Sequence, residues 1–289
     1  MDQLLVTVLN GVANGAVYGL VGLGLVIIFQ STDVMNFAMA AMATTASYVA
    51  LSAYDAGVAL VVAMVMAVGF ASLFGLAVRE VLIRPLGEGR LFAALVVTMG
   101  VAIGTEHFVG RHWGEQPQAF PRLVEGTVTL GGSRVNTQDL VIIVVAVFAM
   151  AGVAVLFRRT SLGSAMRAVA ESSETAAVLG INSQKVARIA WALGVGLATL
   201  GVVLYAPKVG LTPVVLAPVL FRAFAGILLG GLTSMTGAVV GGLVIGVLDN
   251  LAATYVSASF RDTFVFSVAV LVLLVRPQGM FGRQAFVRV

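Results

Sequence analysis

Residues that could carry out covalent or metal chemistry are scarce in this chain. There is no cysteine, and His107 and His112 stand outside any metal-binding pattern. Lys185 and Lys208 are each followed by valine, so neither belongs to a Gly-Lys-Ser/Thr phosphate loop. No Gly-x-Ser-x-Gly nucleophile pattern occurs. We therefore predict no catalytic residue, no metal site and no cofactor on this chain, and place any ATP hydrolysis on another chain.

Ionisable groups in apolar surroundings are the remaining candidates, because charge is costly in hydrocarbon and is often retained there for transport. They are Asp33, Arg222 and Asp249. An ion-coupled carrier needs a carboxylate within the membrane, and only Asp249 is expected to lie deep. The simpler interpretation places Asp33 in a short cytoplasmic turn and the other two near helix ends. Residues that could face a transport path are Asn10, Asn14, Tyr18, Asn36, Phe37 and Asp249.

The composition defines the elements that must position these residues. Of 289 residues, 60% are hydrophobic and 10% are charged, whereas a soluble domain averages about 45–50% and 25%. This excludes a soluble fold and predicts an all-α polytopic membrane protein forming one domain over residues 1–289, with eight or nine membrane segments. The region Pro213–Val256 is either two full spans or one span and a half-helix. The apolar stretches are Leu4–Phe29, Val34–Ser52, Val58–Val78, Leu91–Val109, Leu140–Phe157, Val186–Ala206, Leu220–Gly231, Ala238–Val256 and Phe264–Val275.

The basic residues predict the topology. Regions Arg79–Arg90, Arg158–Arg188 and the tail from Arg276 hold 11 of the 17 basic residues (3, 5 and 3), which places them in the cytoplasm. The pI near 9.8 therefore reflects cytoplasmic loops rather than nucleic-acid binding. The linker Glu106–Asp139 is expected outside as a loop with a strand-like Gly126–Leu130. The N-terminus is then also outside if the first three stretches all span.

Two further patterns predict packing. The cytoplasmic region about 158–188 contains a helix-forming run, Ser164–Leu179, followed by Gly180 where a C-cap would stand. An amphipathic helix against a cytoplasmic partner is the favoured interpretation, and a helix lying on lipid headgroups is the alternative. Glycines spaced by four, as in Gly11-x-x-x-Gly15-x-x-x-Gly19 and Gly242-x-x-x-Gly246, predict close helix packing within the bundle.

The order of several motifs carries a resemblance to a known family. The chain resembles the permeases of branched-chain amino-acid ABC importers, specifically the shorter, LivH-type of their two permeases, over essentially its whole length. The motifs are Asn10-Gly11 with Gly15, Met35-Asn36-Phe37-Ala38, Arg84-Pro85-Leu86, Arg158-Arg159 to Gly163, Arg167 to Glu171, Ala176 to Asn182, Leu229-Gly-Gly231, Gly237 to Gly242, and Arg276 to Arg283.

The resemblance implies a translocation subunit without ATPase activity in a bacterial inner membrane. Its implied partners are a second permease, forming a heterodimer as is usual, two cytoplasmic ATPases that use the ATP, and an external substrate-binding protein. The family's coupling segment, which docks the ATPase, matches a run of residues here. They are Arg167, Glu171, Glu174, Ala176, Gly180, Ile181 and Asn182.

One departure bears on the cargo. Where the family usually has His-Gly-Glu, this chain has Met39-Ala40-Ala41, which implies a less polar cargo if those residues contact substrate. Leucine-like amino acids are the default cargo, and urea, amides or aromatic acids are carried by relatives. An ion-coupled secondary transporter using Asp249, a channel and a membrane scaffold are the alternatives from other classes.

Overall fold

The computed structural model describes residues 2–87, 89–130, 132–214 and 216–282 as a helical bundle with one hairpin. Each of the nine apolar stretches forms a helix, as predicted. The helices are α1 (Asp2–Thr32), α2 (Met39–Asp55), α3 (Leu60–Val78), α4 (Leu91–Trp113), α5 (Thr137–Arg159), α6 (Ser161–Glu171), α7 (Ser173–Val178), α8 (Ser183–Val209), α9 (Ala217–Gly230), α10 (Met235–Leu251) and α11 (Arg261–Val275). Short turns η1 (Arg79–Ile83) and η2 (Arg84–Leu86) extend α3, and η3 (Ala252–Val256) extends α10.

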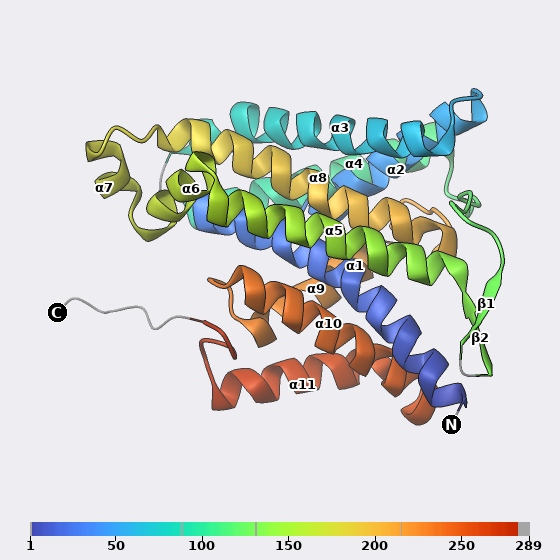
Figure 1. The fold of residues 1–289 in the computed structure, drawn as a ribbon. Helices are drawn as coiled ribbons and strands as arrows, with labels where there is room; N and C mark the ends of the chain where they lie inside the picture. Colours follow the sequence, from blue (N-terminus) through green and yellow to red (C-terminus); the bar gives the residue numbers. More distant parts are fainter. Residues whose placement is uncertain (1, 88, 131, 215, 283–289) are drawn as a thin grey trace.

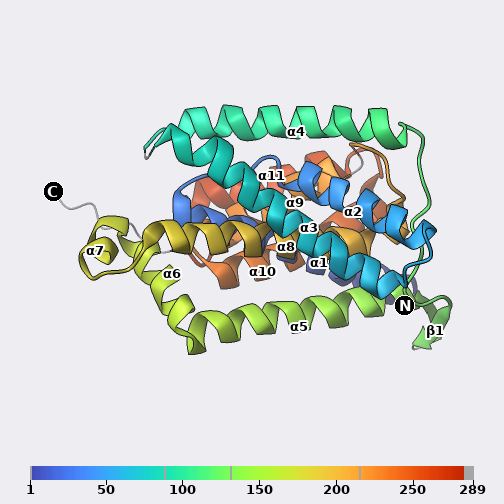
Figure 2. The same ribbon diagram turned by 90° about the horizontal axis from the view of Figure 1, so that it is seen from above.

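Helix α1 is the centre of the bundle. Figure 1 shows α3 and α8 on one side of it and α9, α10 and α11 on the other. Figure 2 shows α4 and α5 at opposite outer edges. Within the described residues, six helices are long and apolar enough to cross a membrane: α1, α3 with η1 and η2, α4, α5, α8, and α10 with η3. Helix α9 is a shorter apolar helix, and α2 and α11 correspond to the two remaining apolar stretches.

Glycines allow α1 and α10 to cross in backbone contact. A Cβ added to Gly246 would lie 2.2 Å from the Cα of Gly15, and one added to Gly242 would lie 2.6 Å from the Cα of Gly19. Gly230 and Gly237 meet in the same way between α9 and α10. Any side chain at these positions would force the helices apart. The predicted role of the spaced glycines, packing within one bundle, is confirmed.

The ambiguous region Pro213–Val256 contains a half-helix followed by a longer helix. Helix α9 has 14 residues, or about 21 Å at 1.5 Å per residue, which is short of a hydrocarbon core of about 30 Å. The chain reaches it from α8 through irregular backbone, where Leu211 and Leu216 are fully buried. Leu211 pairs with Gln118 of the loop between α4 and α5, so the chain turns back at that end of the bundle and α9 is a broken span, one of the two predicted alternatives.

The two ends of the bundle differ in charge. At one end, here the coupling end, lie α6, α7 and the last described residues; at the other, the hairpin end, lie the N-terminus and strands β1 (Thr127–Leu130) and β2 (Ser133–Asn136) (Figure 1). Contact of Arg188 with Glu80 brings the region Arg79–Arg90 to the coupling end as well. The basic regions therefore share an end, as the charge pattern predicts. Arg283, the last residue of the tail motif, lies outside the described residues.

Two predicted segments need correction. The loop between α4 and α5 is 114–136, shorter than Glu106–Asp139, because Trp113 donates to Ser52 Oγ at 2.8 Å and holds the last turn of α4 against α2. The run Ser164–Leu179 is not one helix. Ser172 is extended (φ −162°) and its Oγ accepts from the backbone N–H of Thr175, so it ends α6 and caps α7.

Candidate transport path and coupling segment

A buried ionic cluster lies around Asp249, which is fully buried. Its Oδ1 accepts from Arg261 Nε at 2.9 Å and lies 3.2 Å from Arg222 Nε. Its Oδ2 accepts from Arg261 Nη2 at 2.6 Å and from the Tyr18 hydroxyl at 3.2 Å. Arg222 Nη2 in turn donates to Asp262 Oδ1 at 2.5 Å. The four charged groups balance, as the buried charges of Asp249 and Arg222 require.

This cluster lies at membrane depth. Tyr18, Asp249 and Arg261 each stand 14 positions from the end of their own helix at the coupling end (32 − 18, 249 − 235 and 275 − 261). At 1.5 Å per residue this is about 21 Å for each, against a hydrocarbon core of about 30 Å. Asp249 is also not near a helix end, contrary to the simpler interpretation, because η3 continues the helix to Val256. Asp33, by contrast, is exposed in the turn after α1, as predicted.

The other path candidates lie elsewhere. Asn14 accepts from Lys208 Nζ at 2.8 Å, and the same ammonium contacts Asp139 Oδ1 at 2.5 Å, so Asn14 belongs to a second polar cluster joining α1, α8 and α5. Asn10, one turn before Asn14 on α1, is half-buried. Of the six predicted residues, the structure therefore joins only Tyr18 and Asp249 by a hydrogen bond.

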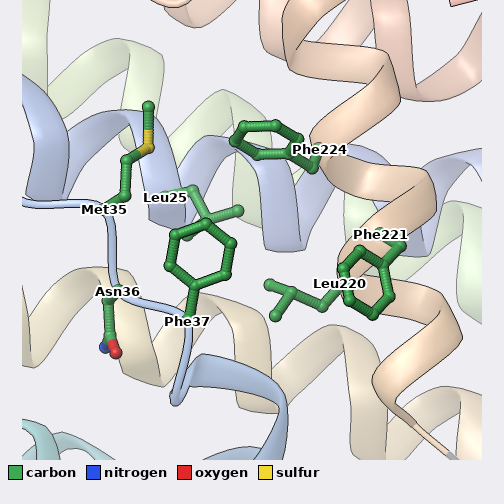
Figure 3. A pocket seen from close by; sticks show the side chains of 7 residues that line it. All are labelled: Leu25, Met35, Asn36, Phe37, Leu220, Phe221 and Phe224. Carbon is green, nitrogen blue, oxygen red and sulfur yellow. The ribbon is translucent and has the colours of Figure 1, made fainter. Parts of the chain in front are cut away.

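Asn36 and Phe37 lie in the link between α1 and α2, beside an apolar pocket. The Phe37 ring lies 6.1 Å from that of Phe224, and Figure 3 shows both turned toward the pocket while the Asn36 side chain turns away. Asn36 Oδ1 accepts from the Ala38 N–H at 3.0 Å, which shapes the turn into α2. The lining residues are Leu25, Met35, Asn36, Phe37, Leu220, Phe221 and Phe224.

The residues that replace the family's polar motif are all buried. Met39 is 0% exposed, Ala40 7% and Ala41 3%, in the first turn of α2. Met39 and Ala40 pack in the main hydrophobic core. At these positions the chain therefore builds core rather than a polar surface.

Among the predicted coupling residues Ala176 is buried, Ile181 is half-buried and the other five are exposed. Ala176 is 1% exposed and packs with Met166 and Val169 against the bundle. Asn182 Oδ1 accepts from the Lys185 N–H at 2.9 Å and caps α8. Gly180 has a φ of +82°, and it ends α7 as predicted, with Ile181 N donating to Ala176 O at 2.9 Å.

The exposed surface of α6 and α7 combines charged and apolar residues. Arg167, Glu171 and Glu174 are exposed, and Val178 and Leu179 are 87% and 73% exposed at the tip of α7. Sequence reasoning did not single out this apolar pair. The sequence did contain a signal for this pair. Two large apolar residues stand directly before the predicted C-cap glycine, at the end of the helix and beyond the face that packs on the bundle.

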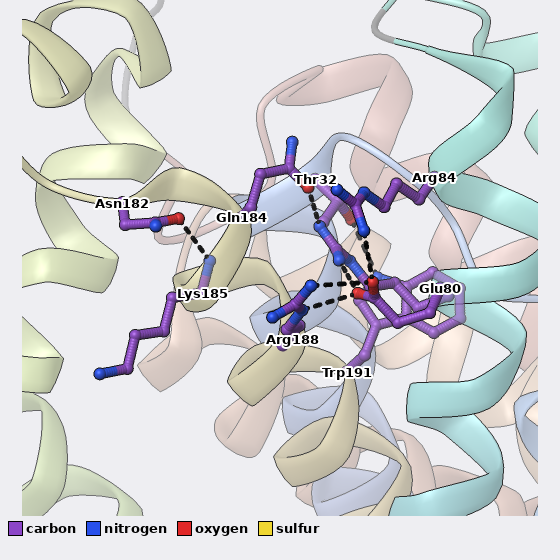
Figure 4. A network of polar contacts seen from close by, with 9 residues as sticks. Thr32, Glu80, Arg84, Asn182, Gln184, Lys185, Arg188 and Trp191 are labelled. Carbon is purple, nitrogen blue, oxygen red and sulfur yellow. Dashed lines mark hydrogen bonds and ion pairs between the residues drawn. The ribbon is translucent and has the colours of Figure 1, made fainter.

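A polar network fixes the start of α8, directly after this tip. Glu80 accepts from Arg84 Nη1 at 3.0 Å and from Arg188 Nε at 3.0 Å. Arg79, only 4% exposed, donates to Glu80 and to Gln184. Figure 4 shows Arg84 of η2 and Arg188 of α8 converging on the Glu80 carboxylate of η1. A second contact from α8 is that of Trp191 Nε1 with Thr32 Oγ1 at 3.4 Å.

A bundle of apolar helices with a broken span and a balanced charge cluster at membrane depth defines a multi-pass membrane transport protein. The family model described as branched-chain amino acid transport system, permease component, matches residues 7–275. The chain belongs to this family, and it is a permease subunit of an ABC importer.

Individual relatives agree with this assignment. The chain is 31% identical to the high-affinity branched-chain amino acid transport system permease protein LivH of Escherichia coli strain K12, covering 95% of this chain and 94% of that protein. It is 30% identical, with the same coverage, to the corresponding protein BraD of Pseudomonas aeruginosa. A solved chain of PsaBC from Streptococcus pneumoniae in complex with Fab has a TM-score of 0.53 and 13% identity, over 93% of this chain and 91% of that one. This last likeness concerns the fold alone.

Proposed function

We propose that this chain forms half of the translocation path of an importer for branched-chain or related amino acids, in a bacterial inner membrane. A second permease supplies the other half, an external binding protein delivers the cargo, and two cytoplasmic ATPases supply the energy. The chain itself binds no cofactor. The membership of the chain in the permease family supports this assignment.

The observation that carries the ATPase partnership is the tip of α7. Val178 and Leu179 are among the most exposed large apolar residues of the described chain, at a loop end that also carries charge. An exposed apolar pair beside charged residues, here Glu171 and Glu174 before it in the chain, is typical of a protein interface. Because α6 and α7 are held to the bundle by Met166, Val169 and Ala176, a partner bound at the tip can move the membrane helices.

The ion-coupled alternative is not favoured by the geometry of Asp249. Both carboxylate oxygens contact protein donors, Oδ1 with two arginines and Oδ2 with Arg261 and Tyr18. Neither oxygen is therefore positioned to bind sodium or carry a proton without breaking the cluster. An energy source on a partner subunit fits this arrangement better.

The test is purification in mild detergent with identification of the co-purifying subunits by mass. We expect two ATPases and a second permease, and their binding protein can then be screened for branched-chain amino acids and, as the alternative cargoes, urea, amides and aromatic acids. Recovery of the chain alone, together with uptake that survives ATP depletion, would contradict the proposal.

A further inference from the structure

Charged side chains at membrane depth reach the outer surface of this chain. The Asp262 side chain is 59% exposed and that of Arg261 is 30% exposed, at the first turn of α11. Charges facing hydrocarbon are strongly disfavoured, so charged residues in membrane segments face protein or a water-filled cavity. The surface formed by α9 and the start of α11 is therefore not a lipid-facing surface.

We propose that this surface is a wall of the translocation path and holds a subsite for the charged ends of a zwitterionic amino acid. Asp262 takes the α-ammonium group and Arg222 takes the α-carboxylate. The assignment rests on the proposed function, because a zwitterion passes this surface only in an amino-acid importer.

The charge balance of the cluster carries the argument. Arg222 and Arg261 face Asp249 and Asp262, so two cations match two anions. A zwitterion adds one charge of each sign. It can exchange partners with the Arg222–Asp262 ion pair and leave every charge paired, which a low-dielectric site requires. A carboxylic acid anion would leave Asp262 unpaired, and an amine cation would leave Arg222 with Asp249 alone.

The position of the two groups fits partner exchange. Arg222 is 9% exposed and is held from behind by Asp249, whereas Asp262 is held in the described structure by Arg222 and is largely exposed. Asp262 can therefore turn toward a ligand while Arg222 stays in place. Once Asp262 has turned away, Arg222 Nη2 is free to donate a charge-assisted hydrogen bond to the ligand carboxylate.

The apolar pocket of Figure 3 is not part of this subsite. Leu220 and Phe224 stand two positions before and after Arg222 on α9, which turns them about 160° away from it at 3.6 residues per turn.

The test uses the complete importer, with both permeases, ATPases and binding protein, reconstituted in vesicles. A leucine analogue with a photoreactive diazirine in its side chain is added with ATP, irradiated, and mapped by mass spectrometry. We expect label in residues 217–230 or 261–275. Leucine should compete for this label, whereas 4-methylpentanoate and 3-methylbutylamine, which each lack one charged end, should not.

Matched variants separate recognition from structure. Asp262→Asn should lower the label by about tenfold, the loss expected for one charge-assisted hydrogen bond, while the ATPases still co-purify. Asp33→Asn makes the same change at an exposed position outside the cluster and should leave the label unchanged. Label elsewhere, or equal competition by the two analogues, would overturn the subsite.

Two further outcomes are distinct. The Asp262→Asn variant could lose the label and also fail to co-purify with the second permease. This result would show that the surface is only a subunit contact, and it would overturn the subsite. Absence of ATP-dependent leucine uptake by the assembled wild-type importer would contradict the proposed function itself, and the subsite with it.

Discussion

Arg188 donates from Nε and Nη2 to the two carboxylate oxygens of Glu80, at 3.0 and 3.1 Å. This bidentate pair joins the start of α8 to the turn that extends α3, two segments more than 100 residues apart in sequence. Because α8 begins directly after α7, displacement of the coupling segment reaches α3 through this contact. We therefore expect Glu80 to transmit movement of α7 to α3.

Glu80→Gln should weaken this link. The substitution removes the charge that binds Arg188 and leaves the buried Arg79 guanidinium without its anionic partner, at a cost of about 1–3 kcal/mol. We expect a lower melting temperature in detergent and less uptake per ATP hydrolysed in the reconstituted importer. Arg84→Gln is the control, because Arg84 is 52% exposed and an exposed pair contributes about 0–1 kcal/mol. Equal effects of the two variants would contradict a special role for Glu80.

Gly246→Ala should prevent α10 from packing on α1. The new Cβ would lie 2.2 Å from the backbone of Gly15, and because backbone cannot move aside as a side chain can, the cost should exceed the usual 1–3 kcal/mol of overpacking. Gly152→Ala is the matched control, because nothing lies within 4 Å of its added Cβ, and alanine there should be neutral or gain up to about 1 kcal/mol. The monodisperse yield and melting temperature of both variants measure the difference. Normal yield of Gly246→Ala would show that the crossing is looser than described.

The helices and their glycine contacts were predictable because both are encoded locally. The length of an apolar run fixes a membrane helix, and glycines four residues apart mark a face where backbones can meet. The break at Ser172 was also encoded locally, since Ser172 and Thr175 have the spacing of an N-cap, but the surrounding alanines favoured one helix.

The pairing of charges was not predictable in the same way. Asp249 meets Arg261 across the turn at η3 and meets Arg222 and Tyr18 through the packing of separate helices. Sequence spacing does not define such contacts. The available signal was compositional, namely four charged residues of balanced sign, two within neighbouring apolar segments and two just before the last one.

Val178→Asp should reduce binding of the ATPases. It places a charge on one residue of the exposed apolar pair, which is expected to lose its contact with water when the ATPase docks. Desolvation of this charge should cost about 1–3 kcal/mol, a fall of about 5- to 150-fold in affinity for the ATPase. Co-purification and titration of the ATPase onto the purified permeases measure it. Val128→Asp, at a 41% exposed valine of the hairpin at the opposite end, should leave ATPase binding unchanged. Retention of full affinity in Val178→Asp would remove the tip from the interface.

Glu171→Lys should uncouple ATP hydrolysis from uptake while the permease remains folded. Glu171 is exposed at the end of α6, so the reversal of charge changes the docking surface without disturbing the packed face formed by Met166 and Val169. The ratio of leucine taken up to ATP hydrolysed measures coupling, with the melting temperature recorded in parallel. Normal uptake in this variant would remove Glu171 from the coupling segment.

Asp249→Asn should destabilise the protein rather than reveal ion coupling. In the described structure the change leaves Arg261 without its acidic partner and Arg222 with Asp262 alone, and removing one member of a buried ion pair typically costs about 3–5 kcal/mol. Loss of uptake in this variant alone would therefore not identify a proton or sodium carrier. The added substitution Arg261→Gln restores the charge balance, leaving Arg222 paired with Asp262. Melting temperatures of the two single variants and the double variant form a cycle, in which Asp249→Asn/Arg261→Gln should be more stable than Asp249→Asn. A double variant as unstable as the sum of the two singles would show that the geometry of the cluster, and not its charge balance, sets its stability.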